Sequence, residues 1–336
     1  MERTRIALAL GLESTTEARR ALEKFARHVD VVELRLDMMK EWYLPELLHD
    51  HPCPVIVTCR PAWEGGRFEG DEQIRIETLV KAAELGAEHI DCELEAVARL
   101  AGRELGATKL IVSKHDFDAM PNLAVLHQRC CEAGADVAKV VGMATSATDV
   151  LPAAEVLRGA SAPSIAFAMG AQGVASRLLA VKYGAYLTFA SLDNADRQTA
   201  PGQLSLETLR EVYLIRDIDA GTTVYGHLAP GEPDHVALAR ANRTLRSAGH
   251  NAVVVPLVIE DDDPGAVVAA FRESGFGGFS VHPVLGAAAM HGAEQLDGTA
   301  EVHGRADCIV TQDGYWMGYA SNDTPLDLLL ALQAGP

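Results

Sequence analysis

The sequence contains no lysine after Lys182, although it runs to residue 336. Basic residues are scarce overall, and the formal net charge at pH 7 is −18. This balance argues against nucleic acid or an anionic membrane as a general partner, because there is no basic excess to neutralise phosphate groups. It is compatible with a local cationic pocket for a small acid. The change in composition along the chain predicts a domain boundary near residues 215–222.

Several other signals are missing. There is no G-x-G-x-x-G or Walker pattern, so no dinucleotide-binding turn is expected. There is no apolar segment of 18 residues, and the apolar run near the N-terminus is too short for a signal peptide, so we expect a cytoplasmic protein. The six cysteines form no C-x-x-C pair and have no zinc-type spacing, which predicts reduced core thiols at Cys53, Cys59, Cys92, Cys130, Cys131 and Cys308.

Short apolar segments alternate with segments of helical spacing over the first two thirds of the chain. Helical spacing is clear at 71–87 and 176–185. Regular alternation of this kind predicts a parallel sheet, and eight such units fit a compact (β/α)₈ TIM barrel. An open doubly wound sheet is the alternative. The eight predicted strands are 5–10, 31–37, 54–60, 89–95, 109–117, 137–143, 164–170 and 186–192.

Charged side chains collect inside these apolar segments or at their ends. In a barrel, the C-terminal ends of the strands carry the active site. Buried charges are costly unless they are paired, so charged side chains on several neighbouring strands indicate a pocket rather than a core. The residues in question are Glu33, Arg35, Asp37, Arg60, Asp91, Glu93, Glu95, Lys114, His115, Asp116 and Lys139.

Lys139 lies in the middle of the apolar segment "GADVAKVVGM". A lysine there either extends outward from a strand end or is used chemically. Apolar surroundings favour the neutral amine, which can attack a ketone and form a Schiff base. A histidine such as His115 could then move the proton that the imine acidifies, and Arg60 and Arg177 could hold a carboxylate substrate.

Residues 1–215 resemble type I 3-dehydroquinate dehydratase. The resemblance rests on ordered motifs over the whole segment: "VELRLD", "VIVTCRPAWEGGRFEGDE", "GAEHIDCELE", "IVSKHDF", "GADVAKVV", "AFAMGAQGVASRLLAVKYGAYLTFASL" and "TAPGQLS". It implies a (β/α)₈ barrel that dehydrates 3-dehydroquinate in the shikimate pathway. A different Schiff-base barrel, such as an aldolase, would share the lysine but not "VELRLD" and "APGQ". A non-catalytic metabolite-binding or regulatory protein derived from a pathway fusion is the further alternative.

The resemblance also implies roles for individual residues. Lys139 would form the Schiff base, His115 would act as general acid and base, and Glu64 would orient and polarise His115. Where the family usually has serine, this chain has Thr199, which keeps the hydroxyl. No metal or organic cofactor is implied, and a homodimer is expected. The implied substrate-binding residues are Glu33, Arg35, Arg60, Arg177, Thr199, Gln203, Met169 and Phe189.

Residues 217–336 are predicted to form a smaller α/β domain. We expect strands at 222–228, 251–258, 277–281, 307–311 and 316–320, and helices at 234–249 and 262–275. The segments "TTVYGHL", "RANRTLRSAGHNAVVVPLV", "ESGFGGFSVHPV", "DCIV" and "GYASND" resemble the N-terminal, substrate-binding domain of shikimate dehydrogenase.

The functional motifs of that second family are not preserved. Gly286 stands where its catalytic lysine belongs and Asn322 where its catalytic aspartate belongs; Asp307 replaces an asparagine, and the paired serines correspond to His235 and Ala237. The sequence also ends at Pro336, before a nicotinamide-binding domain would begin, and we therefore expect no dehydrogenase activity. The domain would either be structural, mediating packing or oligomerisation, or would bind another ligand through a pocket built around His235 and His282.

Overall fold

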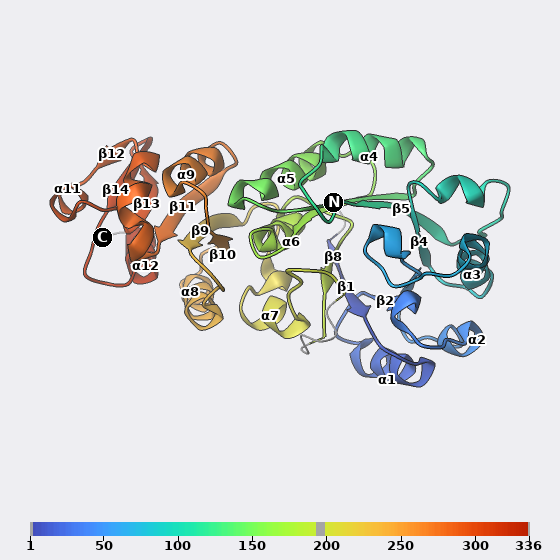
Figure 1. Cartoon of the computed structure of the whole chain (residues 1–336). Coiled ribbons are helices and arrows are strands. Elements are labelled where there is room, and N and C mark those ends of the chain that lie inside the picture. The colour runs from blue at the N-terminus through green and yellow to red at the C-terminus, as the bar shows by residue number, and fades with distance from the viewer. Residues whose placement is uncertain (1–2, 193–198, 335–336) are drawn as a thin grey trace.

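The computed structural model describes residues 3–192 and 199–334, and within these ranges the chain forms two sheets that lie side by side (Figure 1). The first sheet has eight parallel strands in the order β7-β6-β5-β4-β3-β2-β1-β8. Its strands are β1 (Arg5–Leu10), β2 (Val31–Arg35), β3 (Val55–Thr58), β4 (His89–Glu93), β5 (Lys109–His115), β6 (Val137–Met143), β7 (Ser164–Met169) and β8 (Leu187–Ala190).

The two end strands of this order, β7 and β8, come together and nearly close the barrel. Tyr186, directly before β8, donates its backbone N–H to the carbonyl of Ser164 at the start of β7 (2.8 Å). On the other side, β8 pairs in parallel with β1. This sequential order, with the last strand beside the first, confirms the (β/α)₈ barrel and excludes the open doubly wound sheet.

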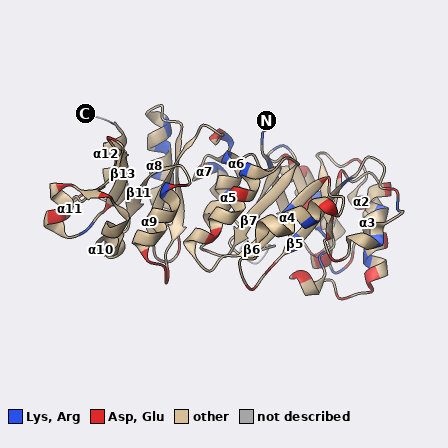
Figure 2. Cartoon of the chain, turned by 90° about the horizontal axis from the view of Figure 1, so that it is seen from above, with Lys and Arg blue, Asp and Glu red and all other residues tan. Residues whose placement is uncertain are grey.

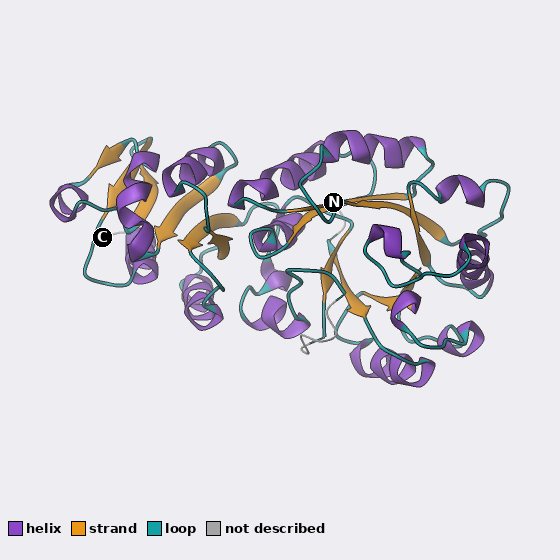
Figure 3. Ribbon diagram, viewed as in Figure 1, coloured by secondary structure: helices purple, strands orange, loops and turns teal. Residues whose placement is uncertain are grey.

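Helices surround the barrel strands (Figure 3). Their starts follow the local sequence; Asp71, for example, accepts the backbone N–H groups of Gln73 and Ile74 and so caps the third helix. The helices of this part are α1 (Thr15–Phe25), α2 (Leu44–Leu47), α3 (Glu72–Glu84), α4 (Leu123–Glu132), α5 (Val150–Gly159), α6 (Val174–Lys182) and α7 (Leu206–Glu211).

Several predicted strands extend further at their C-terminal ends than the observed strands do. β2 ends at Arg35 rather than at residue 37, because residues 36–38 turn into a 3₁₀ helix. The reason is Asp37, whose carboxylate accepts the backbone N–H groups of Arg60 and Arg67 and both Nε and Nη2 of Arg35. These bonds hold the turn in which the chain leaves the sheet after β2.

Two clusters of apolar side chains fill the molecule. The larger one lies between sheets and helices and continues from the barrel into the second domain. The smaller one fills the inside of the barrel and includes Ile56, Val141 and Ile165. Period-two alternation along each strand separates the two clusters, as in β6, where Val140 belongs to the outer cluster and Val141 to the inner one.

The second sheet has six strands in the order β10-β9-β11-β13-β14-β12. The first three are parallel neighbours, whereas β13 is antiparallel to both β11 and β14. The strands are β9 (Thr223–Ala229), β10 (Ala252–Val258), β11 (Phe276–Val281), β12 (Gln295–Leu296), β13 (Cys308–Gln312) and β14 (Tyr315–Tyr319); the helices are α8 (His235–Ser247), α9 (Pro264–Arg272), α10 (Gly286–Ala289), α11 (Gly298–His303) and α12 (Pro325–Ala334).

This arrangement confirms a smaller α/β unit after the barrel. The short strand β12 and the helices α10, α11 and α12 were not foreseen from the sequence. The predicted stop of α8 is present, since Gly249 follows the helix with a left-handed φ of 83°. The boundary at residues 216 and 217 stays a prediction. Among the helices in the described ranges, none combines the length and apolar character that a membrane span requires.

Candidate active site

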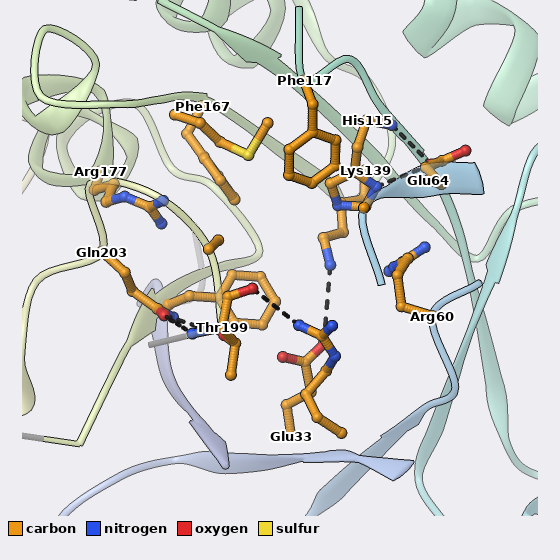
Figure 4. A pocket seen from close by; sticks show the side chains of 15 residues that line it. Glu33, Arg60, Glu64, His115, Phe117, Lys139, Phe167, Arg177, Thr199 and Gln203 are labelled. Carbon is orange, nitrogen blue, oxygen red and sulfur yellow. Dashed lines mark hydrogen bonds and ion pairs between the residues drawn. The ribbon is translucent and has the colours of Figure 1, made fainter. Parts of the chain in front are cut away.

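A cavity opens at the C-terminal ends of the barrel strands, where the barrel architecture places active sites. Every residue that the resemblance implied for the site lines this cavity. Arg177 and Gln203 lie across it from Arg60 and Glu64, and Lys139 extends between them (Figure 4). The cavity is lined by Glu33, Arg35, Arg60, Glu64, Gly65, His115, Phe117, Lys139, Phe167, Met169, Arg177, Phe189, Thr199, Ala200 and Gln203.

Lys139 is held from the middle of β6 with only 4% of its surface exposed. Its Nζ lies 2.9 Å from Oδ2 of Asp91 and 4.0 Å from Oε1 of Glu33. The same nitrogen stands 4.6 Å from the ring centre of Phe189. The sequence argument rested on apolar neighbours, but the structure surrounds the amine with carboxylates and an aromatic face. The Lys139 nitrogen thus forms an ion pair with Asp91 and lies against the ring of Phe189.

A chain of alternating charges continues from Lys139 to the outside of the barrel. Arg60 donates to Oδ1 of Asp91 (2.7 Å) and to Oε1 of Glu93 (2.5 Å), and it also donates to the Ser113 hydroxyl (2.8 Å). Glu93 is in turn paired with Arg75 of α3, 2.6 Å away. All of these side chains are buried, and each charge has an opposite charge beside it, which is the condition for keeping charges inside a protein.

The network fixes the charge of Asp91. Burial by itself would raise the pKa of this carboxyl group, but the charges of Arg60 and Lys139 outweigh burial and hold the pKa well below its usual range. The Ser113 hydroxyl also donates to Oδ1 of Asp91 (2.6 Å). Asp91 is therefore a carboxylate at neutral pH, and it presents a fixed negative charge to whatever cation stands at Nζ of Lys139.

His115, at the end of β5, is oriented by Glu64. Oε1 of Glu64 accepts the backbone N–H of His115 (2.8 Å) and lies 3.0 Å from its Nδ1. The other oxygen of Glu64 lies 3.3 Å from Nζ of Lys114. With Nδ1–H donating to Glu64, the remaining nitrogen, Nε2, is left as the proton acceptor.

The surroundings also set the protonation state of His115. Burial, followed by the positive charges of Arg60 and Lys139, lowers the pKa of His115 well below its ordinary value. The ring of Phe117 stacks on the imidazole at a centroid distance of 6.2 Å. The imidazole is therefore neutral at pH 7 and can act as a general base.

The segment 199–203 closes one side of the cavity. Arg35, fixed by two bonds to Asp37, donates from Nη1 to the carbonyl of Thr199 (3.1 Å). Oε1 of Gln203 accepts the hydroxyl and the backbone N–H of Thr199 at 3.0 and 3.1 Å. Threonine thus makes the hydroxyl contact within this segment that a serine would make.

Arg177, in the middle of α6, is a buried cation that faces the cavity. It has 1% of its surface exposed, and its guanidinium stands 4.4 Å from the ring centre of Phe167. Within the described residues it has no carboxylate partner, and its Nη2 donates to the carbonyl of Pro201 (3.2 Å). Burial lowers the pKa of Arg177 to about 10. A ligand carboxylate would supply the missing negative charge.

Sequence reasoning missed some members of the site. Asp91 was noticed as a charge on its strand but not assigned to the site, although it makes the short ion pair with Lys139. The signal was the alternation Asp91, Glu93 in an otherwise apolar strand. Phe117 and Phe167 were missed because an aromatic residue in a strand is usually core.

The second-domain residues singled out in the sequence are spread over several elements. Asp307 is buried and accepts Nε of Arg305 and the backbone N–H of Ser321. Nδ1 of His235, at the start of α8, lies 3.4 Å from the hydroxyl of Tyr213. The remaining positions, Ala237, His282, Gly286 and Asn322, lie on α8, directly after β11, at the start of α10 and after β14.

The cavity at the C-terminal ends of the barrel strands can bind a carboxylate, and it contains a neutral imidazole and a lysine beside a carboxylate. This combination suits amine attack on a ketone followed by proton transfer at the neighbouring carbon. Within residues 3–192 and 199–334, no cluster of three or more His, Cys, Asp or Glu side chains has the geometry to hold a metal ion.

Comparisons with known proteins agree with this geometry. The family model described as type I 3-dehydroquinase matches residues 6–220. The bifunctional 3-dehydroquinate dehydratase/shikimate dehydrogenase of Arabidopsis thaliana, named as chloroplastic, is 34% identical over 303 residues, which cover 86% of this chain and 50% of that protein. The 3-dehydroquinate dehydratase of Methanocaldococcus jannaschii is 33% identical over 221 residues, covering 63% of this chain and 99% of that protein.

A solved structure of the dehydroquinate dehydratase and shikimate dehydrogenase parts of S. pombe AroM has the same fold across both units. It covers 95% of this chain and 64% of that chain, with a TM-score of 0.53 and 24% identity. The chain thus spans half the length of the Arabidopsis relative, and its second unit resembles the substrate-binding domain of shikimate dehydrogenase. The match to the family model, together with the barrel and its site, shows that the chain belongs to the type I 3-dehydroquinase family.

Proposed function

We propose that this chain is a type I 3-dehydroquinate dehydratase, a lyase of the shikimate pathway that converts 3-dehydroquinate to 3-dehydroshikimate. The observation that carries the proposal is the shared cavity of Lys139 and the His115–Glu64 pair. Lys139 supplies an amine for a ketone and His115 supplies a neutral base, and the two residues lie on the adjacent strands β6 and β5.

The proposed reaction proceeds through an iminium and an enamine on Lys139. The ammonium of Lys139 gives a proton to Nε2 of His115, and the freed amine attacks the C3 ketone of the substrate. The C3 oxygen takes back this proton and a second one from the amine, and it leaves as water as the iminium forms. The iminium withdraws electrons from C2, and Nε2 of His115 takes a C2 proton, leaving an enamine. His115 then returns this proton to the C1 hydroxyl, which departs as water as the C1–C2 double bond forms. Hydrolysis of the imine releases the product and restores Lys139.

Asp91 has an electrostatic part in this sequence. The nitrogen that it faces is an ammonium before the reaction and an iminium during it, so the same carboxylate stabilises both cations at 2.9 Å. Because Asp91 is held by Arg60 and Ser113, it does not have to reorganise when the iminium forms.

Substrate binding would use the opposite wall. Arg177 is the proposed partner of the substrate carboxylate, because it is a buried cation without a carboxylate partner among the described residues. Glu33, Arg35 and Gln203 line the cavity within reach of substrate hydroxyls, while Arg60 is largely occupied by Asp91 and Glu93 and acts chiefly through them.

The test is turnover of 3-dehydroquinate, followed by the absorbance of the conjugated enone in the product. We expect the wild-type chain to be active and Lys139→Ala to lose turnover while keeping its circular dichroism spectrum. Lys81→Ala is the matched control, because Lys81 is exposed and pairs with the exposed Glu84. Full activity in Lys139→Ala would refute the proposal.

The second domain is proposed to lack dehydrogenase activity, since Gly286 and Asn322 stand at the positions of the catalytic lysine and aspartate. We also propose a homodimer in the cytoplasm, without nucleic acid or membrane as partner, in keeping with the net charge of −18. Sedimentation analysis tests the homodimer, and an assay with shikimate and NADP tests the absence of oxidation.

A further inference from the structure

We propose that the second domain braces helix α6 and thereby positions Arg177, with Asp262 as the positioning residue. Viewed from above, the second domain lies against the side of the barrel formed by α5, α6 and α7 (Figure 2), as it also does in Figure 1. β10 packs directly on α6, and α9 packs on the 3₁₀ turn Ala147–Asp149. The inference rests on the proposed dehydratase function, for which Arg177 binds the substrate carboxylate.

The second domain holds the C-terminal end of α6 by backbone carbonyl groups. Nζ of Lys182, the last residue of the helix, donates to the carbonyl of Thr222 (2.6 Å) and to that of Ala220 (3.2 Å). The hydroxyl of Tyr183 donates to the carbonyl of Ser274 (3.2 Å). These bonds come from two separate segments of the second domain, so they restrain both the position and the rotation of the helix end.

Asp262 holds the opposite end of α6, through the loop that leads into the helix. Its Oδ2 accepts the backbone N–H of Ala147 (3.1 Å), which belongs to the loop after β6, and lies 3.5 Å from Nε2 of Gln172 in the loop after β7. Gln172 is buried at 9% exposure. One carboxylate of the second domain therefore joins two neighbouring loops on the catalytic rim of the barrel.

The loop after β7 connects this carboxylate to the cavity. Gly170, two residues before Gln172, donates its N–H to the carbonyl of Pro201 (3.3 Å), which also accepts Nη2 of Arg177 (3.2 Å). Gly202 fits so closely against Gly170 that a Cβ on Gly202 would come within 2.2 Å of the Gly170 carbonyl oxygen. The wall that carries Arg177 and the segment 199–203 is thus fixed through a loop that the second domain holds.

The expected consequence is a change in substrate affinity rather than in chemistry. Lys139, His115 and Glu64 lie on β6, on β5 and in the turn after β3, away from α6. A displaced α6 would weaken the contact between Arg177 and the carboxylate, which is made equally in substrate and transition state, and KM would rise with little change in kcat.

The experiment uses the full chain and compares Asp262→Ala, Asp262→Asn and the control Asp261→Ala. We expect Asp262→Ala to raise the KM for 3-dehydroquinate about tenfold, as for a lost hydrogen bond to a charged group, with kcat within about twofold of wild type. Asp262→Asn keeps an oxygen acceptor and should recover most of the affinity. Asp261 is an exposed neighbour, and its variant should match the wild type.

A second measurement on the same variants does not depend on turnover. Amide hydrogen exchange over residues 170–182 should be faster in Asp262→Ala than in Asp261→Ala. Unchanged exchange there, or an unchanged KM in an active enzyme, would overturn the inference. A loss of melting temperature and kcat with KM preserved would also overturn it, since that pattern marks a merely structural contact. Absence of turnover in the wild type would instead refute the proposed function.

Discussion

The ion pair between Asp91 and Lys139 allows a quantitative prediction about stability. In Asp91→Asn the side chain keeps its shape but loses its charge, which leaves two buried cations with fewer partners. Arg60 retains Glu93 at 2.5 Å, whereas among the carboxylates of the described residues Lys139 retains Glu33 at 4.0 Å. Breaking a buried pair costs roughly 3–5 kcal/mol, and because Arg60 stays paired we expect the lower end, about 3 kcal/mol of unfolding free energy.

The assay is urea-induced unfolding followed by far-UV circular dichroism, with the melting temperature as a second readout. A loss of about 3 kcal/mol should lower the melting temperature by roughly 6–12 °C for a unit of this size. The control is Glu84→Gln, which breaks the exposed pair with Lys81 and should cost less than about 0.5 kcal/mol. The expected costs differ because the Glu84–Lys81 pair is exposed, whereas the Asp91–Lys139 pair is buried.

A double-mutant cycle isolates the pair itself. Lys139→Met combined with Asp91→Asn removes both charges, so the double variant should be more stable than the sum of the single effects predicts, by about 2 kcal/mol. Strict additivity, or a cost below about 1 kcal/mol for Asp91→Asn with a native spectrum, would refute the reasoning that these buried charges hold each other.

Three further predictions concern a positioning residue, a close approach and a pH effect. Glu64→Gln should lower kcat about tenfold with KM nearly unchanged, because His115 loses the carboxylate that orients it; equal kcat would contradict this. Gly202→Ala should raise KM, because the added Cβ meets the Gly170 backbone, and wild-type kinetics would speak against that contact. Burial lowers the pKa of His227 to about 4. Below pH 6.5 the unfolded chain therefore binds a proton at His227 that the folded chain does not bind, and the free energy of unfolding should fall from pH 6.5 towards pH 4. His227→Gln should reduce this fall in urea titrations at pH 7 and pH 5, and an identical fall would contradict the assignment.

The barrel was predictable because its strands are buried on both faces. Such strands read as continuous apolar segments, and a charge inside one of them, such as Lys139, is conspicuous for that reason. The strand ends were less predictable, since β2 stops at Arg35 through the bonds of Asp37 to backbone groups about 25 residues later in the chain. Contacts at that sequence separation leave no local signature.

The ion-pair partners of the charged residues in the strands could not be predicted from the sequence either. Asp91 and Glu93 were visible on their strand, but their contacts with Lys139 and Arg75 depend on the register of β4, β5 and β6 and on how α3 packs. The role of Asp262 was hidden for a similar reason. In the segment "EDDDP" Asp262 is one of four acidic residues before a helix, and the expected cap is made by Asp263.

The central claim is that Lys139 forms a Schiff base with 3-dehydroquinate in this cavity. The most direct test is borohydride reduction in the presence of the substrate, followed by intact mass measurement and peptide mapping. Our account predicts one covalent adduct per chain, on Lys139, and none in Lys139→Ala. Folded protein that turns over 3-dehydroquinate but yields no adduct, or an adduct on another lysine, would contradict it.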